Sequence, residues 1–282
     1  MKKFNAKIVK LVLPAFLLLI ITANAQKLPG KQEESVRSPG NIKIDGRAVE
    51  WGGQFAAYNK STQLFYIVSN NDDNLYLTVQ ATDSATIQRI IAHGLTFTVN
   101  GSTRKNDKQH IAVTFPLFKN FGDYRSINRN LAYNPANFLT DPVTIKKVTD
   151  SLVYAMNNQI IIKSNEFSVT GISSGTDTTL QIDNKTGIKA IGLFENKSTY
   201  TVEFAIPVKY LEGHADKLSY NVKINGTAAK DAPHIVTTHR IVTVSEQDLM
   251  QIRNSPPPRL PVVDEPIDFW GEYSLAKKHT LN

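Results

Sequence analysis

The chain has 282 residues, no cysteine and a formal net charge of +7. Four of its 32 basic residues lie in the first 25 positions, which contain no acid, so the rest of the chain has 28 basic and 25 acidic residues. Those basic residues are scattered, whereas nucleic-acid binding needs a clustered basic surface. We therefore expect no nucleic-acid partner, and the lack of cysteine excludes a cysteine nucleophile and a cysteine-ligated zinc site.

The first 25 residues have the three parts of a secretory signal peptide. Lysines precede an apolar run, Leu11 to Ala23, and Ala23, Asn24 and Ala25 form a small-residue cleavage site. The apolar run is shorter than the roughly 20 residues that span a bilayer, although an uncleaved anchor is an alternative. We expect cleavage near Ala25, a secreted, periplasmic or cell-surface location, and no membrane span in the mature chain. A cysteine-free exported chain that starts with Lys-Lys is typical of bacteria.

The next segment, residues 26–40, is polar, contains Pro and Gly and shows no period, which predicts a linker. Downstream, apolar and polar residues alternate along short segments. Residues 63–69 and 75–82 flank a polar turn and predict an antiparallel hairpin. Residues 95–99 are followed by Asn100-Gly101, a strong turn signal, and residues 110–115 are their expected partner.

Further strands follow along the second half of the chain, at Gln159–Ser164, Glu166–Ile172, Ile188–Glu195, Tyr200–Pro207 and Leu218–Gly226. In the last two, every second residue is apolar, so each strand has one buried face. One buried face per strand is typical of antiparallel sheets that stack on each other.

Helices are few. One is expected from Asp83 or Ser84 to Gly94, with apolar residues at helical spacing, and another over residues 141–158, with Asp141 as the N-cap. A short third helix is expected from Ser245. The sequence therefore predicts a mainly β fold, an antiparallel, jelly-roll-like β-sandwich with two or three short helices, in one domain over residues 41–282.

Three stretches have no clear period, namely Pro116–Thr140, Ala228–His239 and Ser255–Pro266. The first is rich in aromatic residues, Asn and Arg. Long aromatic-rich loops on a β scaffold are common places for a binding site.

Several short motifs resemble the family 9 carbohydrate-binding modules and their DOMON-like relatives. They are IKIDGRAVEW (Ile42–Trp51), DDNLYLTVQATD (Asp72–Asp83), GLTFTVNG (Gly94–Gly101), YTVEFAIPVKYL (Tyr200–Leu211) and DFWGEYSLAK (Asp268–Lys277). Such modules open with a strand, an Asp-Gly turn and a Glu-Trp pair. The resemblance implies a β-sandwich whose Asp45-Gly46 turn leads to Trp51, which we expect to plug the space between the sheets.

Family members that bind sugars hold a ring between aromatic side chains, so the resemblance implies an oligosaccharide or polysaccharide partner. Trp270 is one candidate, although its place in an alternating strand favours a core position over a sugar platform. The alternative ligand-binding residues are Tyr124, Arg125, Tyr133 and Phe138 in the irregular stretch, where they could instead pin the loop to the sandwich.

Such modules also carry structural calcium, for which Asn71, Asp72 and Asp73 offer oxygen ligands. A solvated turn is the favoured interpretation of these three residues, and no other cofactor is expected. Motifs for a serine hydrolase, a P-loop or a dinucleotide site are absent from the sequence.

Three hypotheses follow. The first is an exported, non-catalytic carbohydrate-binding module that engages glycans at or outside the cell envelope. The second is an envelope sandwich that makes protein contacts without sugar affinity. The third is a glycoside hydrolase with a carboxylate pair, for which Glu195 and Glu203 are weighed but expected to face outward.

Overall fold

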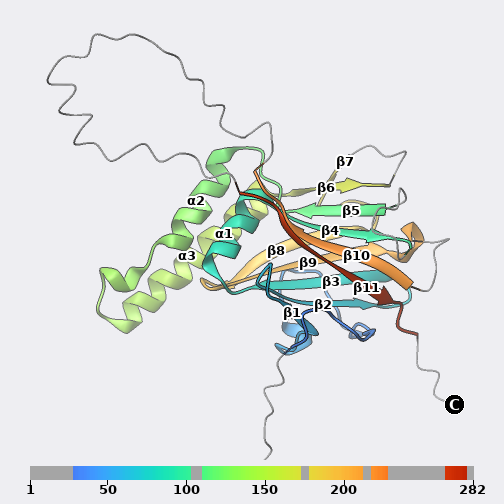
Figure 1. The fold of residues 1–282 in the computed structure, drawn as a ribbon. Coiled ribbons are helices and arrows are strands. Elements are labelled where there is room, and N and C mark those ends of the chain that lie inside the picture. The colour runs from blue at the N-terminus through green and yellow to red at the C-terminus, as the bar shows by residue number, and fades with distance from the viewer. Residues whose placement is uncertain (1–27, 103–109, 173–177, 212–216, 228–263, 278–282) are drawn as a thin grey trace, which may run out of the picture.

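Two antiparallel sheets stack on each other in the computed structural model (Figure 1), which describes residues 28–102, 110–172, 178–211, 217–227 and 264–277. The five-stranded sheet has the order β1 (Ala57–Asn59), β2 (Leu64–Asn70), β3 (Asn74–Ala81), β9 (Thr199–Pro207) and β8 (Lys189–Asn196). The six-stranded sheet has the order β11 (Ile267–Ser274), β10 (Lys217–Ile224), β4 (Leu95–Asn100), β5 (His110–Phe115), β6 (Glu166–Thr170) and β7 (Thr178–Gln181). The predicted mainly β sandwich is confirmed.

Both predicted hairpins are confirmed. β2 pairs with β3 from Leu64 opposite Ala81 to Asn70 opposite Leu75. β4 pairs with β5, and its Asn100 lies opposite His110. These pairings follow from local signals, because alternating segments on either side of turn residues have few other ways to bury their apolar face.

The core lies between the sheets and contains the apolar side chain of every second strand residue. Phe97 of β4 and Phe204 of β9 meet across the sandwich with ring centroids 5.9 Å apart. Tyr66 of β2 packs on Phe269 of β11 at 4.8 Å, which closes one edge of the core. Burial of this apolar surface is the main force that holds the two sheets together.

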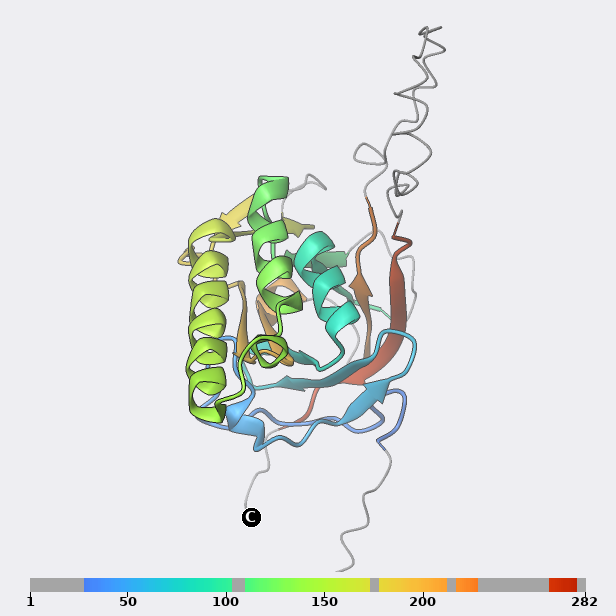
Figure 2. The same ribbon diagram turned by 90° about the vertical axis from the view of Figure 1, so that its left-hand side faces the viewer.

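Three helices cover one end of the sandwich, as Figure 2 shows: α1 (Ser84–His93), α2 (Phe121–Ala132) and α3 (Pro142–Lys163). Asp83 caps α1 and Asp141 caps α3, each accepting a bond from a backbone N–H three residues on, as predicted. α2 lies in the stretch where no element was expected. Single 3-10 turns occupy Val49–Trp51, Pro135–Asn137 and Val208–Tyr210.

The strand predicted at Gln159–Ser164 is wrong, because α3 continues to Lys163. Its β-branched run favours a strand locally, but Met156 and Ile160 keep the helical spacing and are both buried in the core. Burial of one helical face therefore outweighs the local preference. The expected third helix at Ser245, residues Ala228–His239, most of Ser255–Pro266 and the predicted signal peptide lie outside the described residues.

The segment before β1 crosses the outer face of the five-stranded sheet and differs from expectation in two ways. Residues 42–44 form no strand and pair with no strand of the described part of the chain. Trp51 does not fill the space between the sheets: it is half-buried on the outer face, where its indole N–H donates to Thr78 Oγ at 3.1 Å. The expectation of a core plug was wrong because the chain passes over the sheet and not between the two sheets.

Glu203 of β9 holds this segment in place. One carboxylate oxygen accepts the backbone N–H groups of Asp45 and Gly46, each at 2.9 Å, and the other accepts the hydroxyl of Thr78 at 3.3 Å. Glu203 faces outward from the sheet, as expected, yet it is completely covered. Gly46 has a φ of +79°, and an added Cβ would lie 2.9 Å from the backbone nitrogen of Leu193, so the turn requires glycine.

Burial is the main cause that raises the pKa of Glu203 to about 7. The two backbone N–H bonds oppose this shift, and the nearby Glu50 and Asp45 carboxylates add to it. Buried oxygens of Asp45 and Glu50 find no hydrogen-bond partner among the described residues. An ionised Glu203 therefore lowers the stability of the folded protein, and protonation of the carboxylate removes this destabilisation.

None of the helices in the described part of the chain is long and apolar enough to cross a membrane.

We predict that Glu203 makes the domain less stable as the pH rises through 7. Its folded pKa lies above the ordinary value of 4.5, so protons bind more tightly to the folded protein, and the contribution is fully present below pH 4.5. Between pH 5 and pH 8 the wild type should lose roughly 2–3 kcal/mol of unfolding free energy relative to Glu203→Gln. Denaturant titrations of both proteins across this range measure the difference.

The wild type and Glu203→Gln contain the same histidines and other titratable groups, so the difference between their unfolding free energies reports the titration of Glu203 alone. Glu203→Ala serves as the matched control, because it removes both the charge and the acceptor for the Asp45-Gly46 turn and should be unstable at every pH. Parallel pH profiles for wild type and Glu203→Gln would contradict this account.

Candidate functional site

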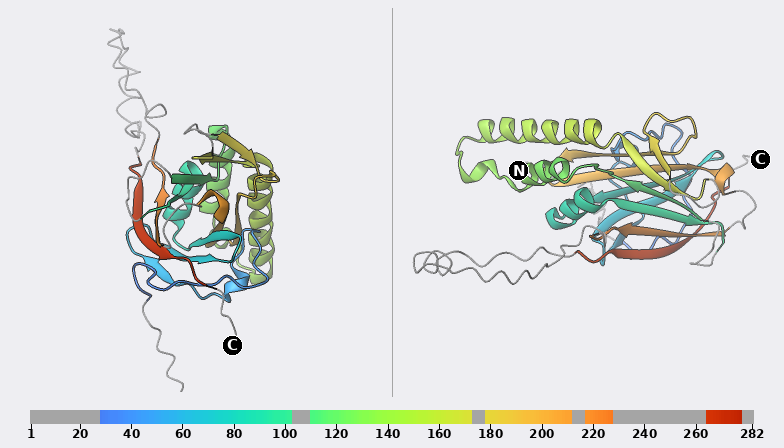
Figure 3. Two further views of the ribbon diagram at one scale, coloured as in Figure 1. Left: turned by 90° about the vertical axis from the view of Figure 1, so that its right-hand side faces the viewer. Right: turned by 90° about the horizontal axis from the view of Figure 1, so that it is seen from above.

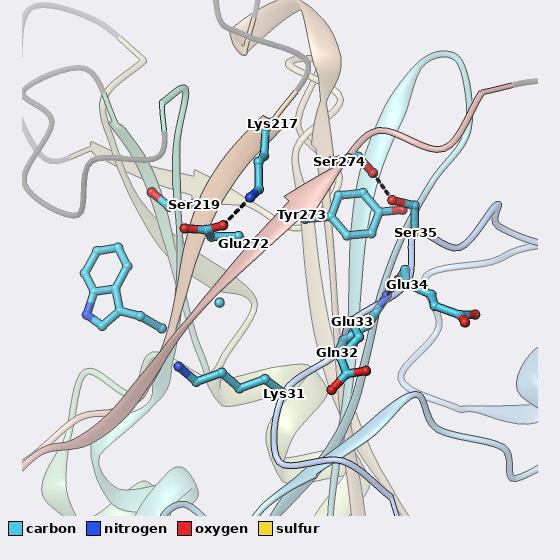
Figure 4. Close-up of a pocket in the computed structure, with 12 residues that line it drawn as sticks. Lys31, Gln32, Glu33, Glu34, Ser35, Lys217, Ser219, Glu272, Tyr273 and Ser274 are labelled. Atoms are coloured by element: carbon cyan, nitrogen blue, oxygen red, sulfur yellow. Dashed lines mark hydrogen bonds and ion pairs between the residues drawn. The ribbon is translucent and has the colours of Figure 1, made fainter.

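A groove of about 560 Å³ runs along β11, at the edge of the six-stranded sheet (Figure 4). One wall is residues 31–35, and the other is formed by β10 and β11. The side chains that line it are Lys31, Gln32, Glu33, Glu34, Ser35, Lys217, Ser219, Trp270, Glu272, Tyr273 and Ser274. The groove thus combines an indole with several hydroxyl, amine and carboxylate groups.

Trp270 lines this groove because of the alternation of β11. Phe269 and Tyr273 are buried in the core, so Trp270 and Glu272 project from the other face of the strand. The Trp270 side chain is half-buried and lies outside the core. The sequence had favoured a core position for Trp270 over this outward one. Gly271 permits this arrangement: a Cβ there would lie 2.2 Å from the ring of Tyr220, which packs beneath the strand.

Polar side chains surround the indole on the outer face of the sheet. Asn221 of β10 is the cross-strand neighbour of Trp270, and its amide donates to Asp268 at 2.5 Å. Lys217 and Glu272 form an ion pair at 2.5 Å, drawn in Figure 4. Ser219 donates to the backbone of Ser102 at 2.8 Å. Fixed donors and acceptors therefore lie next to an apolar ring.

Residues 28–40, for which the sequence predicts a linker, include the other wall of the groove. Gln32 is buried, and its side-chain amide bonds both backbone groups of Val68, accepting from the N–H at 2.7 Å and donating to the carbonyl at 2.8 Å. Further along, Arg37 bridges to Asn70 of β2, and the Ser35 hydroxyl donates to the carbonyl of Ser274 at 2.5 Å. This segment therefore packs along the edge of the sandwich.

Sequence reasoning missed Lys31, Ser35 and Glu272 as groove residues. Glu272 could have been found, because it shares a strand face with Trp270 two residues earlier. Lys31 and Ser35 gave no signal, since the bonds that position their segment are made to strands far along the chain.

The other predicted ligand-binding residues lie elsewhere. Tyr124 and Arg125 belong to α2, and the Tyr124 ring packs against Phe118 with centroids 6.4 Å apart. Tyr133 and Phe138 lie in the connection from α2 to α3, at the far end of the helices from β11 in Figure 1 and in the view from above in Figure 3. Their rings stack in parallel at 5.7 Å, and Phe138 is 73% exposed. The structure therefore does not bring these aromatics together with Trp270.

The residues considered for calcium form a bonded turn. The side-chain oxygen of Asn71 accepts the backbone N–H groups of Asp73 and Asn74, at 2.9 and 2.7 Å. Asp72 forms an ion pair with Arg37 at 2.9 Å. Within the described residues, no cluster of three or more His, Cys, Asp or Glu side chains could hold a metal ion. A calcium ion at Asn71, Asp72 and Asp73 stays a prediction.

No family model matches the chain, and no curated protein matches it. A solved structure with a similar arrangement is a family 9 carbohydrate-binding module from Caldicellulosiruptor kristjanssonii in complex with glucose. The two chains have 9% sequence identity and a TM-score of 0.34, and the match covers 88% of this chain and 97% of the other. These values do not assign the chain to that family.

We predict that Gln32 fixes the groove wall formed by residues 31–35. Gln32→Ala removes two buried hydrogen bonds to Val68 and should cost about 2 kcal/mol of unfolding free energy. Hydrogen exchange should then accelerate over residues 31–35 more than over β2. The matched control is Gln54→Ala, since Gln54 is exposed and its loss should change neither measurement. Equal effects of the two substitutions would contradict the assignment.

Proposed function

We propose that this chain is an exported, non-catalytic β-sandwich that binds carbohydrate, and that a sugar ring stacks on Trp270 in the groove along β11. The observation that carries the proposal is an outward-facing, half-buried indole that lies beside fixed polar groups. Export and a location at or outside the cell envelope rest on the signal-peptide pattern of the first 25 residues.

The chemistry of the groove suits a sugar. One face of a pyranose ring presents C–H groups, which pack on an aromatic plane, while its hydroxyls need donors and acceptors in fixed positions. Ser219 and the Lys217–Glu272 pair supply such groups on the sheet side, and Lys31 and Ser35 supply them on the opposite wall. The volume of about 560 Å³ lies within the range of small-ligand sites, roughly 300 to 1,000 Å³.

A hydrolytic role has less support. Glu203, one of the two acids weighed for catalysis, is completely buried and cannot touch a polysaccharide. Glu195 accepts hydrogen bonds from Gln80 and Thr201 on the outer face of the five-stranded sheet, which is not the sheet that forms the groove. Glu272 is engaged in an ion pair with Lys217.

A role in protein contacts is favoured by a different observation. Large exposed apolar side chains gather between residues 133 and 162, on the connection from α2 to α3 and along α3. This surface lies at the helical end of the molecule, so contacts there are compatible with a sugar in the groove (Figure 1).

We predict that Trp270→Ala weakens carbohydrate binding at least tenfold, because the loss of ring stacking removes about 1.4 kcal/mol or more. Trp270→Phe should keep most of the affinity, since an aromatic face remains. A glycan array identifies the oligosaccharide, and calorimetry with and without EDTA then gives the affinity of each variant and any dependence on calcium.

The matched control is Trp51→Ala. Trp51 lies on the outer face of the other sheet, so its loss should lower the thermal midpoint but leave the affinity of the folded protein unchanged. If the folded wild type binds no oligosaccharide on the array, the proposed function is wrong. If binding survives in Trp270→Ala, the sugar lies elsewhere.

A further inference from the structure

α3 carries apolar side chains on two opposite faces. Met156 and Ile160 are buried against the sandwich, as the helical spacing requires. On the outer face, Val143 is 76% exposed and Tyr154 is 70% exposed. A soluble helix that covers a sheet normally turns charged and polar residues to the solvent, so this outer face needs an explanation.

Several of the exposed residues of α3 lie along one straight stripe. At 3.6 residues per turn, Val143, Lys147, Asp150, Tyr154 and Ile161 point within roughly 60° of one another. We call these five residues the outer stripe. Its first four line a shallow groove of about 510 Å³ together with Lys146 and Ser151.

The first four residues of the outer stripe are complementary to themselves when the helix is reversed. A copy of the helix laid antiparallel, with its centre halfway between residues 148 and 149, places Val143 opposite Tyr154 at both ends. The same arrangement places Lys147 opposite Asp150 twice. Apolar residues thus meet apolar residues, and each charge meets its opposite.

The two remaining groove residues, Lys146 and Ser151, point about 140° apart around the helix, so they border the two flanks of the stripe and do not face each other across the axis. Within one chain, Lys146 already pairs with Asp150 at 2.6 Å. Asp150 would therefore accept from Lys146 of its own chain and from the partner's Lys147, which forms a small charge network at the centre of the interface. A surface that pairs with itself in this way has the property that a two-fold symmetric dimer requires.

We propose that two copies of this chain associate through the outer stripe of α3, with the two helices antiparallel about a two-fold axis. This interface is distinct from the groove on β11 and does not depend on the proposed sugar binding. It uses the surface where the exposed apolar side chains are concentrated.

The connection from α2 to α3 extends the contact. Phe138 and Tyr133 lie just beyond the N-terminal end of α3. In the antiparallel pair, this end of one chain projects along the C-terminal half of the other helix, toward Ile161 and Ile162, which are both exposed in a single chain. The dimer would therefore cover the exposed aromatic pair as well as the centre of the stripe.

Other occupants fit the outer stripe less well. An anionic membrane surface would attract the lysines but repel Asp150, which lies at the centre of the stripe. A purely apolar partner helix would leave Lys147 and Asp150 desolvated without partners, which is costly. A second copy supplies an apolar partner for Val143 and Tyr154 and an oppositely charged partner for Lys147 and Asp150.

Charge reversal tests the proposal on the chain from Gln26 to Asn282, by sedimentation at increasing concentration. The wild type should be a dimer, and Asp150→Lys or Lys147→Asp should each weaken the dimer at least tenfold, because like charges would then face each other twice. The double variant Lys147→Asp/Asp150→Lys restores both pairs and should return to within about threefold of the wild-type dissociation constant. Lys60→Asp, at an exposed position outside the helices, is the matched control and should remain dimeric.

The absence of native cysteine allows a second measurement of the register. Val143→Cys and Tyr154→Cys proteins, mixed under oxidising conditions, should form a disulfide between the two variants, and neither protein should crosslink by itself. A monomeric wild type would overturn the proposal and assign the stripe to another partner. A dimer that ignores both charge reversals, or that crosslinks through Val143→Cys by itself, would overturn it equally.

Discussion

A single buried carboxylate determines how the N-terminal part of this domain is built. Glu203 accepts two backbone N–H groups from the Asp45-Gly46 turn, and it does so on the outer face of a sheet where water would otherwise reach it. A buried charge at that place destabilises the fold unless it is hydrogen-bonded. The Asp45-Gly46 turn and Thr78 supply these hydrogen bonds, and Trp51, which bonds Thr78, shields the carboxylate from water. The position of the chain before β1 follows from this one contact, because Gly46 can approach β8 only in the conformation that Glu203 holds.

This anchoring makes the two outer faces of the sandwich different. The outer face of the five-stranded sheet is covered by the N-terminal segment around Trp51, whereas residues 31–35 reach the edge of the six-stranded sheet and form the wall of a groove there. Trp270 faces that groove because its strand neighbours Phe269 and Tyr273 fill the core. The polar side chains available to a ligand therefore gather beside β11, because Gln32 and Ser35 hold residues 31–35 against β2 and β11.

The elements that were predictable from the sequence depend on contacts close in the chain. The hairpins β2–β3 and β4–β5 and the caps at Asp83 and Asp141 all join residues within one turn or one hairpin. The wrong predictions concern residues whose structure depends on contacts distant in the chain. Ile160 lies in a helix and not in the predicted strand, because its side chain packs into the core. Trp51 covers the outer face of a sheet, because Glu203 holds its segment there. For the groove, the alternation of β11 is visible in the sequence, but it does not show which of the two faces is buried, and the sequence favoured a core position for Trp270. The wall at Lys31 could not be predicted, because no local pattern links it to β11.

The two proposals reinforce each other physically. One indole with a few hydrogen bonds gives a modest affinity for a single sugar unit, since each contact replaces one made with water. A polysaccharide, however, presents the same unit many times. Two grooves held in one dimer, at the ends of sandwiches joined through α3, would convert the second binding event into an intramolecular one, with a gain of roughly 10²–10⁴ in apparent affinity when the spacing of the units matches. Dimerisation through α3 would then strengthen polysaccharide binding in the groove, because it places two grooves in one particle.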